Sequence, residues 1–134
     1  MTQIEREPMP YGRVLIVDDV ATNLYIARGL MAPYKLKIDV ADSGSATLKK
    51  ISSGETYDII FMDHLMPDMD GVETTKRMRE AGYDLPVVAL TANVEPDQAE
   101  FFLANGFDDF ISKPVDVAQL DVILKKYVRD GRSS

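Results

Sequence analysis

Short apolar runs alternate with longer stretches of mixed polarity along most of the chain. Five runs have the length and composition of strands, at residues 14–17, 36–40, 58–62, 86–90 and 109–111. The first is apolar throughout, which is typical of a strand buried on both faces of a sheet. The second alternates apolar and polar positions, which favours a strand at the edge of the sheet.

The stretches between these runs have apolar positions at three- and four-residue spacing, which predicts helices. Local signals place the helix ends: Ser43 is expected to cap the second helix and Gly54 to end it, while Pro96 suits the first turn of the fourth. The predicted helices cover about residues 21–31, 44–53, 71–81, 96–105 and 117–128. Strict alternation with short connections predicts a parallel sheet with helices on both faces.

Length and composition fit a single α/β domain. The chain has 134 residues, 46% of them apolar, which is enough for a sizeable core. We expect the domain at residues 13–129, with residues 1–12 as a tail or linker and residues 130–134 as a flexible tail. No apolar stretch approaches the roughly 18–20 residues that span a bilayer, so no direct membrane contact is expected.

Charge and cysteine content narrow the function classes. The net charge of −7 argues against nucleic acid as a direct partner, because binding phosphates requires a basic face. The chain has no cysteine, which excludes disulfides and thiolate metal sites and fits a cytoplasmic location.

Polar residues follow four of the five predicted strands at the point where each strand ends. Asp18 and Asp19 follow the first strand, Asp63 the third, Thr91 the fourth and Lys113 the fifth. If the strands are parallel, these side chains meet at one edge of one sheet, where open α/β sheets place their chemistry.

Three carboxylates brought together favour a cation. Two unit charges ~4 Å apart repel by about 4 kcal/mol at an effective dielectric constant of ~20. An all-oxygen site of this kind suits a hard divalent ion, with Mg²⁺ expected here. The alternative is that Asp18 and Asp19 only cap the first helix.

A carboxylate beside a bound metal can also attack phosphorus, forming an acyl phosphate. Lys113, Thr91 and the backbone N–H groups of Leu65 and Ala92 could then bind the phosphoryl oxygens.

The complete set of motifs resembles the signature of response regulator receiver domains. It comprises Asp18-Asp19, Asp63 with Met66-Pro67 and Asp70-Gly71, Thr91-Ala92 and Lys113-Pro114, in the family's order and spacing over roughly residues 13–128. The resemblance implies a flavodoxin-like (βα)5 doubly wound parallel sheet with strand order 2-1-3-4-5. It also implies a phosphoacceptor in two-component or phosphorelay signalling, which is not an enzyme beyond its own phosphorylation and dephosphorylation.

The resemblance implies a role for each matching residue. Asp63 would accept a phosphoryl group from a phosphohistidine, and would bind Mg²⁺ directly together with Asp19 and the backbone carbonyl of Leu65. Asp18 would hold the ion through water. Lys113 would bind the phosphoryl group and Asp63.

The same resemblance assigns the switch. Thr91 would move toward the phosphoryl group, which the N–H of Ala92 would also bind, and Phe110 would turn inward as the second switch residue. Leu65 and Asn93 would flank the path of the hydrolytic water. Because Leu65 cannot orient water, we expect a long-lived phosphoryl state. His64, the only histidine, is interpreted as a partly exposed loop residue.

The segments 62–66 and 106–115 look most like receivers attached to hybrid sensor histidine kinases. We therefore expect a receiver excised from a longer kinase, with a free-standing single-domain regulator as the alternative. The expected partners are a histidine kinase and a histidine phosphotransfer domain, docking on the first helix near Leu24 and Ala27. A weak homodimer through the fourth helix, fifth strand and fifth helix is also possible, with Phe101 exposed there.

Two further readings remain open at this point. A Mg²⁺-dependent hydrolase with an aspartyl nucleophile, of the haloacid dehalogenase type, uses the same acyl-phosphate chemistry. Enzymes of that type carry an Asp-x-Asp motif that begins with the nucleophile. In this chain the position two residues after Asp63 is Leu65, not an aspartate. A receiver used only as a scaffold would have lost an acid, the threonine or the lysine, and this chain retains all of them.

Overall fold

Five parallel strands form one sheet in the computed structural model, which describes residues 7–63, 71–91, 96–113 and 115–129. The strand order is β2-β1-β3-β4-β5, as expected. The outer strands are β2 and β5, whereas β3 and β4 are buried at every position. The strands are β1 (Arg13–Val17), β2 (Lys37–Ala41), β3 (Ile59–Asp63), β4 (Val87–Thr91) and β5 (Asp109–Ser112).

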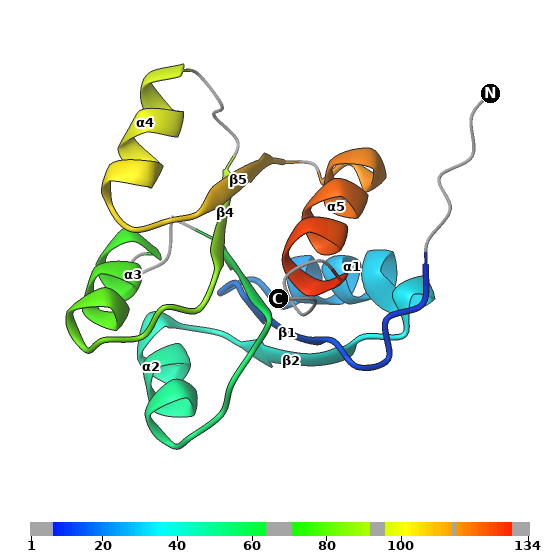
Figure 1. Ribbon diagram of the computed structural model, residues 1–134, viewed down its shortest axis with the longest axis horizontal. Helices are drawn as coiled ribbons and strands as arrows, with labels where there is room; N and C mark the ends of the chain where they lie inside the picture. Colours follow the sequence, from blue (N-terminus) through cyan, green and yellow to red (C-terminus); the bar gives the residue numbers. More distant parts are fainter. Residues whose placement is uncertain (1–6, 64–70, 92–95, 114, 130–134) are drawn as a thin grey trace.

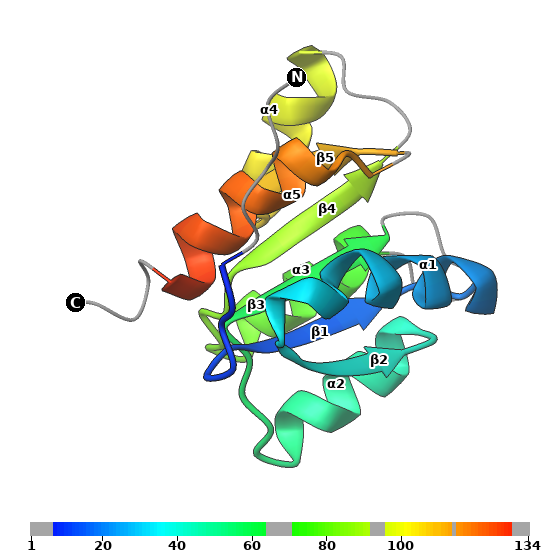
Figure 2. The same ribbon diagram turned by 90° about the vertical axis from the view of Figure 1, so that its right-hand side faces the viewer.

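Five helices cover the two faces of this sheet. In Figures 1 and 2, α1 and α5 lie on one face, and α2, α3 and α4 lie on the other. The helices are α1 (Ala21–Met31), α2 (Gly44–Ser52), α3 (Gly71–Glu80), α4 (Pro96–Ala104) and α5 (Val117–Leu124). A 3₁₀ turn, Ala32–Tyr34, follows α1, and a π-helical turn, Lys125–Arg129, continues α5. None of the helices within the described ranges is long and apolar enough to cross a membrane.

The core has two layers because strand side chains alternate between the faces. Val14 and Ile16 of β1 pack with the residues of α1 and α5, whereas Leu15 and Val17 pack with those of α2, α3 and α4. Each strand between two helical layers must therefore be apolar at consecutive positions, as the sequence pattern indicated.

Local signals set the helix ends as predicted. The Ser43 hydroxyl accepts a hydrogen bond from the Ala46 N–H at 3.0 Å, which caps α2. Gly54 and Gly106, which follow α2 and α4, have φ of 103° and 95°, in the left-handed region that favours glycine.

The structure differs from the sequence-based expectation at the amino-terminal segment. Residues 7–12 were expected to belong to a tail or linker, yet Met9 is fully buried in the α1/α5 layer of the core. Its N–H donates to the carbonyl of Tyr34 at 2.6 Å, and Glu7 pairs with Arg129 at 3.1 Å. Burial of a methionine side chain is worth about 1.5–3 kcal/mol, so this segment is an integral part of the domain.

Candidate functional site

The parallel sheet brings the strand-end polar residues together at its carboxyl edge. Val17 of β1 lies in register with Met62 of β3, which places Asp18 beside Asp63. On the other side of β3, Asp63 is in register with Leu90, so Thr91 follows one position further along β4. Four adjacent strands, β1, β3, β4 and β5, thus contribute to one site.

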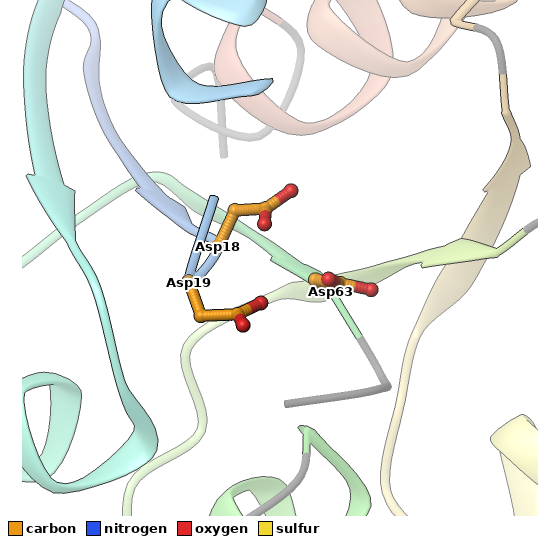
Figure 3. A group of neighbouring side chains, drawn as sticks. All are labelled: Asp18, Asp19 and Asp63. Atoms are coloured by element: carbon orange, nitrogen blue, oxygen red, sulfur yellow. The ribbon is translucent and has the colours of Figure 1, made fainter. Parts of the chain in front are cut away.

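Asp18, Asp19 and Asp63 form a carboxylate cluster. One oxygen from each lies within 4.8 Å of the others. Figure 3 shows the three side chains projecting from the ends of neighbouring strands. Asp18 and Asp63 are buried, at 2% and 6% exposure, whereas Asp19 is exposed. Three carboxylates in their charged form repel strongly at this spacing, and a hard divalent ion with oxygen ligands suits the donor set.

Lys113 is the cation of this cluster among the described residues. Its Nζ lies 3.2 Å from Asp63 Oδ1 and 3.8 Å from Asp18 Oδ2. Its backbone N–H donates to the carbonyl of Thr91 at 2.8 Å, which holds the start of its side chain beside β4. One ammonium against three carboxylates leaves two negative charges, which matches the charge of one divalent cation.

Asp18 also shapes the backbone after β1. Its Oδ1 accepts a hydrogen bond from the N–H of Val20 at 2.9 Å. Val20 is the cap residue of α1, and no side-chain hydrogen bond caps this helix in the described part of the chain. The interpretation of the two acids as mere helix caps is therefore wrong, since Asp18 fixes the preceding turn and faces Lys113 with its other oxygen.

The two expected switch residues lie on β4 and β5. Thr91 is the last residue of β4 and is 1% exposed. Phe110 is half-buried and packs against the core layer of α2, α3 and α4. It also borders a hollow between β5 and α5.

Several predicted site residues lie outside the described residues. Leu65 was predicted to bind the metal and to flank the hydrolytic water, and Asn93 to flank the same water. Ala92 was predicted to bind the phosphoryl group, and His64 to be a loop residue. What the sequence predicts of them stays a prediction.

A hollow beside the carboxylate cluster was not foreseen from the sequence. It lies next to Asp19 and is lined by Leu24 of α1 and by Asp42, Ala46 and Lys50. The signal that could have revealed it is the parallel β2, whose carboxyl end also reaches this edge and is followed by Asp42.

The accessible surface of α1 differs in detail from the expected docking residues. Leu24 is partly exposed and lines the hollow, but Ala27 faces the core at 9% exposure. Tyr25 and Ile26 are instead the exposed apolar residues, at 80% and 53%. An exposed apolar patch next to a polar site is typical of a protein-binding surface.

Comparisons by sequence agree with this geometry. The response regulator receiver domain family matches residues 14–125. The chain is similar to hybrid signal transduction histidine kinase L of Dictyostelium discoideum, with 43% identity over 90% of this chain and 7% of that protein. It is 39% identical to the aerobic respiration control sensor protein ArcB of Escherichia coli (strain K12), over 90% of this chain and 16% of that protein. It thus spans a small part of both kinases.

A shorter relative and two solved structures extend the comparison. Two-component response regulator ORR41 of Oryza sativa subsp. japonica is 36% identical over 86% of this chain and 93% of that protein. The receiver domain of the Francisella response regulator 1452 has a TM-score of 0.83 and 25% identity, covering 90% of this chain and 99% of that one. The receiver domain of Ssk1, in a co-crystal with the Saccharomyces cerevisiae histidine phosphotransfer protein Ypd1, has a TM-score of 0.81. At 24% identity, over 89% of this chain and 90% of that one, this last likeness shows the fold alone.

Proposed function

The chain belongs to the response regulator receiver domains and so to two-component and phosphorelay signalling, and on that premise we propose that Asp63 is its phosphoacceptor. The observation that supports this is the contact between Asp63 and Lys113, 3.2 Å apart, inside a cluster of three carboxylates. Asp63 is buried, at 6% exposure, and is the last residue of β3.

The proposed reaction is transfer from a phosphohistidine of the partner. An oxygen of Asp63 attacks phosphorus, the phosphorus–nitrogen bond breaks, and the electron pair and a proton stay with the imidazole. Lys113 lies where its ammonium can balance the charge of the incoming phosphoryl oxygens. Thr91, the last residue of β4, would offer its hydroxyl to the same group. Phe110 would follow Thr91 as the second switch residue.

Receiver domains bind Mg²⁺ at an acidic pocket, and the carboxylate cluster has the donor set for it. Asp19 and Asp63 would hold the ion directly, Asp18 through water, and the carbonyl of Leu65 would complete the set. Bound Mg²⁺ supplies charge neutralisation for the attack on phosphorus. Removal of any one acid leaves too little charge to hold a divalent ion tightly.

We propose a histidine phosphotransfer domain as the partner, docked on the α1 surface of Leu24, Tyr25 and Ile26. This apolar surface adjoins the hollow that reaches Asp19. The fold relative Ssk1 was crystallised with such a phosphotransfer protein. The similarity to two hybrid kinases favours a receiver within a longer kinase, while the match to nearly all of ORR41 keeps a free-standing regulator as the alternative.

A weak homodimer through α4, β5 and α5 is a second part of the proposal. Phe101 and Leu103 of α4 and Val122 of α5 are exposed apolar residues, at 45%, 55% and 64%. For Phe101 this exposure was expected from the sequence.

The test is incubation with a small phosphodonor and Mg²⁺. We expect one phosphate per chain, stable to acid and labile to alkali, and its complete loss in Asp63→Asn. Because Leu65 cannot orient a hydrolytic water, the phosphoryl state should persist far longer than seconds. No uptake by the wild-type protein would contradict the proposal in favour of a scaffold. Multiple turnover of phosphoesters would instead favour the aspartyl hydrolase.

A further inference from the structure

Arg79, in the last turn of α3, joins three parts of the chain through its guanidinium group. Its Nε and Nη2 donate to the carbonyl of Gly106 at 3.0 and 2.9 Å. Its Nη1 donates to the carbonyl of Tyr83 at 2.9 Å, and Nη2 also donates to Asp108 Oδ2 at 2.9 Å. Arg79 with these three partners is called the Arg79 clamp below. It connects α3 to the turn between α4 and β5, which lies beside α3 in Figure 1.

Asp108 extends the Arg79 clamp to β4. The same Oδ2 that accepts from Arg79 accepts from the N–H of Val87 at 2.8 Å. In return, the backbone N–H of Asp108 donates to the carbonyl of Val87 at 2.8 Å. Val87 is the first residue of β4, and Asp108 directly precedes β5. The amino ends of both strands are therefore tied to each other and to α3.

The turn that the Arg79 clamp holds has little freedom to move. Gly106 has φ of 95°, and a Cβ at this position would lie 3.0 Å from Cγ of Arg79. Phe107 stacks edge-to-face on Phe102 of α4 with ring centroids 5.3 Å apart. A side chain added at Gly106 would thus strain the backbone and displace Arg79.

The functional residues divide between the two halves of the sheet. Asp18 and Asp19 follow β1 and Asp63 ends β3, whereas Thr91, Phe110 and Lys113 belong to β4, β5 and the residue after it. Among the described residues, the hydrogen bonds of the Arg79 clamp reach β4 and the residue before β5, and none of them reaches β1 or β3. Strands of this length rise about 3.3 Å per residue, and a ladder fixed at one end holds its register at the other.

We propose that Arg79, through Asp108, is a positioning residue that keeps Thr91 and Lys113 in register for the phosphoryl group. The proposal rests on the proposed function of Asp63 as phosphoacceptor. Loss of the clamp would leave the Mg²⁺ site on β1 and β3 intact, but weaken the binding of a phosphoryl group, which needs β4 and β5. A purely structural role would not separate these two quantities.

The experiment compares Arg79→Met with a matched control on the same helix. Arg77, two residues earlier, pairs with Glu73 at 2.9 Å on the exposed face of α3, and within the described ranges it has no other ion pair. Arg77→Met therefore removes an ion pair without touching β4 or β5. Asp108→Asn is a second variant, since an amide oxygen can still accept from the N–H of Val87. For each protein, calorimetry measures the Kd of Mg²⁺. Titration with beryllofluoride, a phosphoryl analogue that binds a carboxylate, follows at saturating Mg²⁺.

For Arg79→Met we expect an unchanged Mg²⁺ affinity and beryllofluoride binding weakened about five-fold or more. Asp108→Asn should shift in the same direction by less, and Arg77→Met should match the wild type. Equal losses for both ligands, or no change for either, would overturn the proposal. If Arg79→Met does not fold, Asp108→Asn decides by the same criteria. Wild-type protein that binds no beryllofluoride would instead overturn the proposed function of Asp63, and this inference with it.

Discussion

At the scale of single residues, a buried polar contact outside the functional site joins Tyr34 to Asp121. The Tyr34 hydroxyl, in a fully buried residue, donates to Asp121 Oδ1 at 2.7 Å, and Lys125 lies 2.9 Å from the other oxygen. Burial alone would raise the pKa of Asp121. The hydrogen bonds from Tyr34 and Lys125 outweigh burial, so the pKa is lowered.

This lowered pKa predicts a pH-dependent contribution to stability. The folded-state pKa lies below the unfolded value of about 3.9, so the contribution is present above pH ~4 and is lost as the pH falls below it. Tyr34→Phe should cost about 1–3 kcal/mol at pH 7, because it leaves a buried carboxylate short of a donor, and less at low pH. Urea unfolding at pH 7 and pH 3 measures this. Tyr25→Phe, on an 80% exposed side chain, is the control. An equal loss at both pH values would refute the linkage.

At the scale of elements, α1 and α2 start in different ways. The Ser43 side chain caps α2, and the Thr47 hydroxyl donates back to the carbonyl of Ser43 at 2.9 Å. At the start of α1, by contrast, Asp18 could have served as a cap but belongs to the carboxylate cluster. The α2 helix thus depends on a local signal, and the start of α1 is coupled to the functional site.

Ser43→Ala should destabilise the domain by about 0.5–2 kcal/mol, since one N–H of the first turn loses its acceptor. Ser45→Ala is the matched control: Ser45 is exposed, lies in the same first turn and should change stability by less than about 0.5 kcal/mol. Chemical denaturation of both variants gives the two values. Equal values would mean that the cap is not what distinguishes Ser43.

At the scale of the whole molecule, acidic charge gathers at the proposed metal site. The chain has a net charge of −7, and three of its acids face one another at the sheet edge. A ligand that binds only the folded state stabilises it by RT ln(1 + [L]/Kd), about 2.7 kcal/mol at 100 times Kd. Folding and Mg²⁺ binding should therefore reinforce each other.

Saturating Mg²⁺ should raise the Tm by several degrees, beyond the effect of NaCl at matched ionic strength. Asp19→Asn should lose most of this rise, because Asp19 is an exposed member of the cluster whose removal costs the fold little. Calorimetric scans of both proteins with and without Mg²⁺ make the measurement. The same rise in both proteins would place the ion elsewhere.

Residue type and spacing alone determined the layout of this protein. Apolar periodicity is a local property, so the alternation of strands and helices, the buried β1 and β3 and the edge strand β2 could be predicted from it. The sequence also predicted that the three acids, Thr91 and Lys113 form one site, because they stand at strand ends and parallel strands end at one edge of the sheet. Strand bounds differ by one residue in every strand. The strands β2, β3 and β4 each begin and end one position later than expected, β1 begins one position earlier, and β5 ends one position later.

Only the tertiary structure decided which distant residues touch. Arg79 and Gly106 are 27 residues apart, Tyr34 and Asp121 are 87 apart, and Glu7 and Arg129 are 122 apart. No local pattern encodes such pairs, because they depend on how helices pack on the sheet. The same holds for the burial of Met9 and Ala27, which follows from the packing of the α1/α5 layer of the core. The sequence thus determined which residues carry the chemistry, and the packing of helices on the sheet determined the distances between them.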